Sequence, residues 1–335
     1  MIILGLVVLM SAAIIKPTPL KFEVPKGWPK PSEDIFKNNK LTEEGFELGK
    51  QLFYDGNLSL DGTISCESCH QQFAAFATYD HDLSHGVNNK FTTRNSPALF
   101  NLAWMTDYHW DGGINNIEVQ PLHPFTAENE MGENIENILR KLKENPVYPS
   151  MFKKAFGDDK ITSERVLKSL AQFTGSIVSS NSKYDKVMRG EIEFNNIEKK
   201  GYELFKLNCE SCHKEPLFTD NSFRNNGMDL NRFKDAGRMM ITGKLEDSLK
   251  FKVPSLRNIQ VSFPYMHDGS IFSVPEVIDH YMNISFADNP KVDPVFVKKI
   301  SFTPREKNEL IYFLYALTDS TLLTDSRFGP PKKIF

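Results

Sequence analysis

The four cysteines of the chain all lie in two copies of one pentapeptide, CESCH, at residues 66–70 and 209–213. Each copy has two thiols separated by two residues, with a histidine directly after the second thiol. This pattern attaches a c-type haem: the thiols bond to the two vinyl groups of one porphyrin, and the imidazole faces the iron. The sequence therefore predicts two covalently bound haems, and the attaching residues are Cys66, Cys69 and His70 in the first motif and Cys209, Cys212 and His213 in the second.

Two other interpretations of the cysteines are a disulfide within each pair and one zinc ion bound by all four thiols. Zinc binding would not explain a histidine directly after each pair. A thioredoxin-like site normally has one such motif in a βαβ context, and no such context is found here. Haem attachment is the interpretation that accounts for every cysteine and for both histidines.

The sequence around the two motifs also repeats. Residues 45–48 (GFEL) precede the first motif, and residues 201–204 (GYEL) precede the second. Downstream of each motif, at 162–173 and 303–317, apolar residues three and four positions apart predict a helix with one buried face. In the second of these helices, Thr303 is a good N-cap, Pro304 suits the first helical position and Glu306 completes a capping box.

This repetition predicts a mainly α fold with two cytochrome c-like haem domains, related by internal duplication and containing long irregular loops. We expect an N-terminal cytochrome c-like domain at 41–185 and a C-terminal cytochrome c-like domain at 186–335, each with one haem. Residues 16–40 are rich in Pro and Lys and predict an extended arm.

The first 15 residues contain no charged side chain and are too short to span a bilayer comfortably. They match the apolar region of a signal peptide, and residues 11–13 (SAA) offer small residues for cleavage. The sequence thus predicts export to the periplasm, with an uncleaved membrane anchor as the alternative.

The composition does not point to a nucleic acid or an anionic membrane as partner. The chain has 335 residues, 40% of them hydrophobic, and a formal net charge of −3 with both signs interspersed. This balance gives no indication of nucleic-acid binding. Four cysteines are too few for a fold of this length to be stabilised mainly by disulfides.

Further motifs follow each CESCH copy in a fixed order. NSP lies at 95–97 and HWDGG at 109–113, with Gln120 and Glu130 ten and twenty residues after the tryptophan. PSLRN at 254–258 and PYMHDGS at 264–270 follow the second copy. In this order and spacing the chain resembles the bacterial di-haem cytochrome c peroxidase and MauG superfamily from Leu41 to Asp319.

The resemblance implies roles for individual residues. His70 would ligate the iron of the peroxidatic haem, and His213 that of a second haem that stores or relays an electron. Trp110 would be an aromatic bridge between the haems, and Glu130 the acid–base group that moves a proton between the two oxygens of peroxide. Gln120 and Pro124 match positions that line the distal pocket. Without the resemblance, Trp110 would be read as a core residue and Glu130 as solvated surface.

The resemblance also implies a calcium ion between the domains, held by Asn95 and the backbone carbonyls of Ser262 and Pro264. Oxygen donors of this kind suit a hard cation. Taken alone, Asn95 would be read as a turn residue.

For two further ligands of the haem irons the sequence offers alternatives. Fourteen residues after His267, classical peroxidases of this family have a Met and MauG-type members a Tyr; this chain has Tyr281, with Met282 adjacent. We expect Tyr281 to ligate the second iron and keep Met282 as the alternative. His85 resembles the distal histidine that caps the peroxidatic haem in classical members, but a loop histidine away from iron is the competing interpretation.

The resemblance implies hydrogen peroxide as the substrate and a small cytochrome c or blue copper protein as the electron donor, and it is compatible with a homodimer. One alternative is a MauG-like enzyme that oxidises protein side chains. MauG has a Trp two residues before the second motif, where this chain has Leu207. The other alternative is a non-catalytic di-haem electron carrier, which would not require Glu130 or Trp110.

The remaining histidines are not part of any recognisable motif. We interpret four of them as loop or surface residues, namely His81, His109, His123 and His280. His267 belongs to the PYMHDGS segment, and we expect it to support the haem pocket.

Overall fold

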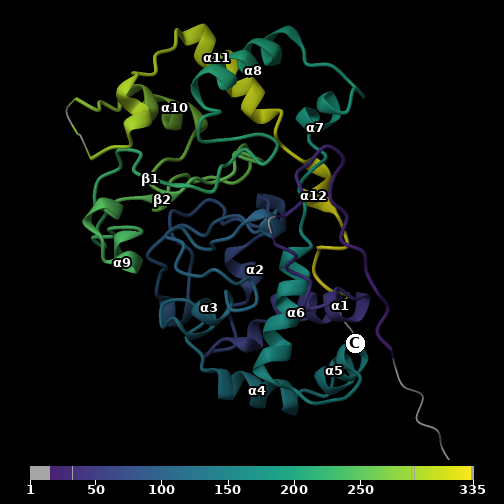
Figure 1. Ribbon diagram of the computed structural model, residues 1–335. Helices are drawn as coiled ribbons and strands as arrows, with labels where there is room; N and C mark the ends of the chain where they lie inside the picture. Colours follow the sequence, from purple (N-terminus) through teal and green to yellow (C-terminus); the bar gives the residue numbers. More distant parts are fainter. Residues whose placement is uncertain (1–15, 32, 288, 290, 333–335) are drawn as a thin grey trace, which may run out of the picture.

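The structure is a computed structural model that describes residues 16–332 except 32, 288 and 290. The predicted signal segment, residues 1–15, lies outside the described residues. The fold is mostly helical with long irregular loops, so the mainly α prediction is confirmed (Figure 1). In chain order the helices are α1 (Glu43–Phe53), α2 (Cys66–Cys69), α3 (Leu122–Thr126), α4 (Ile135–Glu144), α5 (Tyr148–Phe156), α6 (Ser163–Gly175), α7 (Lys183–Met188), α8 (Asn196–Asn208), α9 (Met239–Thr242), α10 (Val274–Asn283), α11 (Pro304–Tyr315) and α12 (Ser320–Thr324).

Two short strands, β1 (Phe223–Arg224) and β2 (Phe251–Lys252), pair antiparallel in the second half. The loops contain short 3₁₀ helices, namely η1 (Gly56–Leu58), η2 (Gln72–Ala74), η3 (Val87–Asn89), η4 (Leu102–Trp104), η5 (Leu245–Asp247) and η6 (Pro294–Val297).

Each half is built on one close crossing of two helices, α1 with α6 and α8 with α11. Both crossings depend on a glycine. A Cβ on Gly49 of α1 would lie 1.9 Å from the backbone oxygen of Ser169, and a Cβ on Gly201 of α8 would lie 2.0 Å from that of Glu309. The two helix axes can approach this closely only because neither glycine has a side chain.

Side-chain caps fix where these helices begin. Thr42 accepts a hydrogen bond from the backbone N–H of Gly45, and Thr162 accepts one from that of Arg165. Thr303 caps α11 with Pro304 at its start, and Glu306 completes the capping box, as the sequence predicts. Each cap satisfies backbone donors that the first helical turn leaves without a partner.

The apolar side chains form two cores. The first is centred on α1, α4, α5 and α6, and the second on α8, α10 and α11. The C-terminal segment after α12 returns to the first core, where the Phe328 ring lies 5.9 Å from Phe46 and 6.2 Å from Phe173. The Tyr54 hydroxyl donates to the backbone oxygen of Phe328 at 2.7 Å. The segment around Phe328 therefore packs against the first core and connects the second half to it.

Residues 16–40 carry no helix or strand in the part that is described, apart from a bridge between Pro19 and Thr42. Trp28 of this arm packs edge-on against Trp104 of the first half at 5.1 Å, and the Arg257 guanidinium of the second half lies 4.5 Å from the Trp28 ring. The Trp104 indole N–H donates to the backbone oxygen of Pro29 at 2.8 Å. The arm thus contacts both halves.

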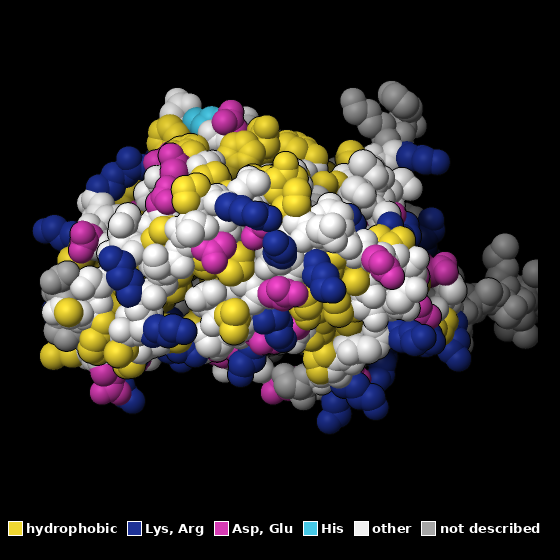
Figure 2. Space-filling view, turned by 90° about the horizontal axis from the view of Figure 1, so that it is seen from above, with side chains coloured by type: hydrophobic (Ala, Val, Ile, Leu, Met, Phe, Trp, Pro, Cys, Tyr) yellow, Lys and Arg dark blue, Asp and Glu magenta, His cyan; other side chains and the backbone are white. Residues whose placement is uncertain are grey.

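Charges of both signs are interspersed on the face of the molecule in Figure 2, as the composition leads us to expect. None of the described helices combines the length and the apolar character needed to cross a membrane.

The glycines at the two helix crossings give a prediction about stability. A change from glycine to alanine there should lower stability, although the same change usually raises it. Glycine to alanine inside a helix normally stabilises by about 1 kcal/mol. We expect Gly201→Ala to destabilise the protein instead, by about 1–3 kcal/mol, because the new Cβ would overlap a backbone oxygen that cannot move freely. Chemical denaturation measures this, with Lys200→Ala on the exposed face of the same helix as the control. An unchanged or raised stability in Gly201→Ala would contradict the tight crossing.

Candidate haem sites

The first CESCH motif begins as a single helical turn, α2, whose start is fixed by Ser65. The Ser65 hydroxyl accepts from the backbone N–H of Ser68, and the Ser68 hydroxyl accepts from that of Ser65 at 3.0 Å. Cys66 and Cys69 are not joined in a disulfide, and both line a cavity of about 590 Å³ together with His70. Burial raises the pKa of the Cys66 thiol to about 12 and that of Cys69 to about 11. Both thiols are therefore protonated at neutral pH.

The His70 ring is fixed by the loop that follows it. Its Nδ1 lies 3.0 Å from the backbone oxygen of Phe76, which can only accept, so Nδ1 carries the proton and Nε2 keeps its lone pair. Burial lowers the pKa of His70 to about 4, which leaves the imidazole neutral. A neutral imidazole with its second nitrogen held by a carbonyl is the form that ligates a metal.

The second motif repeats this arrangement. Cys209 directly follows α8 as its C-cap, and the His213 Nδ1 lies 3.2 Å from the backbone oxygens of Phe218 and Pro254. Burial lowers the pKa of His213 and raises that of Cys209 to about 12. Cys209, Cys212 and His213 line a separate cavity of about 400 Å³.

Both cavities fit a c-type haem by the chemistry of their donors. Each brings together two unpaired thiols and one neutral, oriented imidazole, and their volumes lie in the range of cofactor pockets. The two thiol pairs line different cavities, and no cluster of three or more His, Cys, Asp or Glu suited to a metal ion occurs among the described residues. One zinc ion bound by all four cysteines is therefore excluded.

Trp110 lies in the wall between the two cavities and lines both of them. Its indole N–H donates to the backbone oxygen of Asn95 at 2.8 Å, and its own backbone oxygen accepts from Lys252 at 2.7 Å. Asn95 belongs to the first half and Lys252 to β2 of the second. Trp110 is therefore held between the two cavities by backbone groups of both halves.

Glu130, Gln120 and Pro124 all line the first cavity, as the resemblance implies. They come from α3 and the loops on either side of it. Burial raises the pKa of Glu130, and the nearby His123 partly offsets this by favouring the carboxylate. The carboxyl can therefore exchange a proton closer to neutral pH than an exposed glutamate.

Two histidines that the sequence analysis assigned to loops or the surface also line this cavity. His109 directly precedes Trp110, and its Nε2 lies 3.3 Å from the Gln120 amide nitrogen. The His123 Nδ1 lies 3.6 Å from a Glu130 carboxyl oxygen, and the two imidazole rings pack edge-on at 5.3 Å. Their positions directly before Trp110 and Pro124 were the signal that could have found them.

Burial, together with the neighbouring His123, lowers the pKa of His109 to about 4. His109 is therefore neutral, and its Nε2 accepts the hydrogen bond from the Gln120 amide. This contact fixes which way the Gln120 side chain points.

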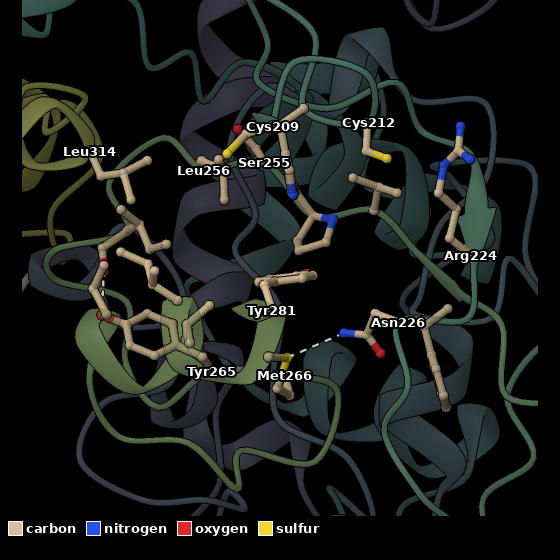
Figure 3. A pocket seen from close by; sticks show the side chains of 18 of the residues that line it. Cys209, Cys212, Arg224, Asn226, Ser255, Leu256, Tyr265, Met266, Tyr281 and Leu314 are labelled. Carbon is tan, nitrogen blue, oxygen red and sulfur yellow. Dashed lines mark hydrogen bonds between the residues drawn. The ribbon is translucent and has the colours of Figure 1, made fainter. Parts of the chain in front are cut away.

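In the second cavity the structure separates Tyr281 from Met282. Tyr281 on α10 lines the cavity, whereas Met282 packs against the second core. Figure 3 shows the Tyr281 ring projecting into the open space between Met266 and the segment of Cys209, Ser255 and Leu256. Burial raises the pKa of the Tyr281 phenol to about 12.

Met266 is a further lining residue that the sequence analysis did not single out. Its sulfur lies 3.5 Å from the Asn226 amide nitrogen, the contact drawn as a dashed line in Figure 3. Next to it, His267 is buried and stacks on Phe251 at 3.7 Å, with no hydrogen-bond partner for Nε2. His267 thus lies in the wall of this cavity, where the sequence analysis expected it to support the haem.

The structure does not bring His85 to the first cavity. Its side chain is exposed and packs against Phe91 at 4.6 Å and His81 at 5.2 Å, while its backbone oxygen lies 3.9 Å from the Cys69 sulfur. The three predicted calcium ligands, Asn95, Ser262 and Pro264, all line the second cavity, and Asn95 also lines the first.

Comparisons with known proteins agree with this arrangement of two sites. The family model of di-haem cytochrome c peroxidases matches residues 43–193. The methylamine utilization protein MauG of Methylorubrum extorquens is 33% identical over 303 residues, which cover 89% of this chain and 83% of MauG. Cytochrome c551 peroxidase of Nitrosomonas europaea is 34% identical over 252 residues, which cover 70% of this chain and 71% of the peroxidase.

Among solved structures, a MauG-like protein associated with microbial copper homeostasis superposes with a TM-score of 0.84 at 31% identity, over 93% of this chain and 99% of the other. The diheme peroxidase BthA of Burkholderia thailandensis shares the fold, with a TM-score of 0.72 at 19% identity, over 88% of this chain and 91% of the other. The chain belongs to the di-haem cytochrome c peroxidase and MauG family. Membership implies two c-type haems, which the two cavities accommodate.

Removing one pair of thiols tests the assignment of the two haems. We expect the double variant Cys209→Ala with Cys212→Ala to carry one covalent haem in place of two, because each pair serves its own cavity. Intact-protein mass spectrometry counts the attached haems, and Cys66→Ala with Cys69→Ala is the reciprocal control. A single thiol pair that retained two haems would contradict the two-site assignment.

Proposed function

We propose that the chain reduces hydrogen peroxide to water, with electrons from a small cytochrome c or blue copper protein. The observation that carries this proposal is the position of Glu130 in the wall of the first cavity, together with Trp110 in the wall that both cavities share. When bound, the haem held by Cys66, Cys69 and His70 would supply iron to receive peroxide, and the haem held by Cys209, Cys212 and His213 would supply an electron store.

Glu130 would move the proton. Cleavage of H–O–O–H requires a base that takes a proton from one oxygen and then returns it to the leaving oxygen. The Glu130 carboxylate starts this cycle, and its partial burial favours the protonated form that completes it. Gln120, held by His109, would orient the peroxide, and Pro124 would shape the pocket beside it. Two protons and two electrons per peroxide give two waters.

A MauG-type oxidation of a protein side chain is the second candidate. The position of Tyr281 in the second cavity favours it, because MauG-type members carry Tyr at this place and Met282 faces away. Leu207 counts against it, since MauG has Trp there. A carrier without catalysis is disfavoured, because it would require neither Glu130 nor Trp110.

The remaining predictions concern the internal duplication, the calcium site, export and His85. The matched crossings at Gly49 and Gly201 support an internal duplication with halves near 41–185 and 186–335. Asn95, Ser262 and Pro264, which share one cavity wall, would hold a calcium ion. Covalent haem attachment and the apolar segment 1–15 support export to the periplasm. His85 would cap the first haem only if its loop moved.

Replacing Glu130 tests the peroxidase mechanism. We expect Glu130→Gln to lower peroxide turnover by about 10² to 10⁴-fold, the range of a lost acid–base group, without changing haem content or midpoint potentials. Glu128→Gln is the matched control, because Glu128 is exposed on the same loop and pairs with Lys90. Unchanged turnover in Glu130→Gln would contradict the role of this carboxyl.

The wild-type protein should also show a characteristic dependence on pH. Catalysis needs the Glu130 carboxylate, and burial raises the pKa of this group above the ordinary 4.5. The value of kcat/KM for peroxide should therefore fall as the pH drops through an inflection above 4.5. The same limb should be missing from the residual activity of Glu130→Gln. An inflection at or below the ordinary value would contradict the assignment.

The axial ligand of the second haem can be tested by spectroscopy alone. We expect Tyr281→Phe to change the optical and EPR spectra of the oxidised protein, since it removes the phenol oxygen from the cavity. Met282→Leu should leave these spectra unchanged, because the Met282 side chain packs in the second core. The reverse result would establish Met282 as the ligand.

A further inference from the structure

Peroxide reduction consumes two protons per turnover, and these must reach the first cavity from solvent. Glu130 moves a proton between the two peroxide oxygens, but this movement brings in none. Its side chain is only 24% exposed, so direct exchange with bulk water is restricted. A second ionisable group between Glu130 and solvent would remove this restriction.

His123 lies at this place. Its side chain is 59% exposed, and its Nδ1 is 3.6 Å from a Glu130 carboxyl oxygen. The residue lies in α3 at the opening of the first cavity and lines that cavity beside Pro124 and Glu130. The distance is that of an ion pair, and a small side-chain movement closes it to a hydrogen bond.

The other groups around this pair are suited to holding it, not to exchanging protons. On the inner side, Glu130 lies near Cys66 and Cys69, whose sulfurs would be in thioether bonds to the haem and would carry no exchangeable proton. His109 packs edge-on against His123 on the inner side and is neutral. The charges that act on His109 are those of Asp111, Lys252 and Arg94, in addition to His123. Histidine is the side chain whose ordinary pKa suits proton exchange near neutral pH.

We propose that His123 is the group that passes protons from solvent to Glu130, and that it also holds the Glu130 carboxylate in its charged form between turnovers. This inference rests on the proposed peroxidase function and adds to it the route of proton entry. His123 acts through Glu130 and is therefore a positioning and relay residue.

The proton transfer balances at each step. A hydronium ion or buffer acid protonates His123 at Nε2, which gives the imidazolium. The imidazolium then gives its Nδ1 proton to the Glu130 carboxylate, which becomes the neutral carboxylic acid while His123 returns to the neutral imidazole. Rotation of the ring or exchange with water resets the tautomer for the next proton. Two such transfers supply the two protons that one peroxide requires.

Two variants of His123 separate proton relay from simple electrostatics. His123→Gln removes both the charge and the exchangeable proton, whereas His123→Arg keeps a positive charge but cannot release its proton. His123 is exposed, so both variants should fold. His81→Gln is the control, since His81 is an exposed loop histidine that lines neither cavity.

The first readout is the ionisation of Glu130, which does not depend on turnover. Infrared difference spectra titrate the protonated carboxyl band that is missing from Glu130→Gln. We expect the pKa of Glu130 to rise in His123→Gln, because the neighbouring cation is lost, and not to rise in His123→Arg or His81→Gln. An unchanged pKa in His123→Gln would overturn the coupling of the two residues.

The second readout is peroxide turnover at several buffer concentrations and fixed pH. We expect His123→Gln and His123→Arg both to lose about tenfold or more in kcat, below the full effect of a lost acid–base group. Small buffer acids should partly restore both variants and leave the wild type unchanged. Full turnover in His123→Arg would overturn the relay in favour of electrostatics alone. Absence of turnover in the wild type would refute the proposed function, and the infrared titration would then decide the coupling by itself.

Discussion

The structure depends on one hydrogen bond that is made twice, from the Nδ1 of a half-buried histidine to a backbone carbonyl a few residues later. His70 makes it to Phe76 and His213 to Phe218. To present this carbonyl, each loop holds Phe76 or Phe218 in the left-handed backbone region, with φ of 59° and 56°. Such a conformation costs about 1–3 kcal/mol. Full burial of both phenylalanine rings offsets this cost, so the loop that orients the imidazole is also part of the core.

A second constraint holds the wall between the cavities. Arg94 pairs with Asp111 at 2.5 Å and with Asp235 at 2.6 Å. In sequence, Arg94 precedes Asn95 and Asp111 follows Trp110, so the ion pairs flank the hydrogen bond between Trp110 and Asn95. Because Asp235 comes from the second half, the network fixes Trp110 relative to both sites. Breaking it would leave buried charges without partners, a cost of several kcal/mol.

The sequence predicts well those features that are determined by neighbouring residues. The thiol and imidazole spacing, the cap at Thr303 and the mainly helical fold all follow from residues close together in the chain. The contacts of His123 with Glu130 and of Phe328 with the first core could not be predicted, because they depend on how loops and chain ends fold back. The choice between Tyr281 and Met282 likewise depends on how α10 is rotated against the second core, which the apolar pattern of one helix does not determine.

The two cavities have the same attachment chemistry but differ in what surrounds it. The first contains ionisable or polar groups opposite the thiols, in Glu130, Gln120, His109 and His123. The second is lined mostly by aliphatic and aromatic side chains around Tyr281 and Met266, and the charged side chains of its lining are cations, namely Arg224, Lys252, Arg257, Lys298 and Lys299. The two linings therefore support the proposed division of roles, with proton transfer at the first cavity and Trp110 in the wall that both cavities share.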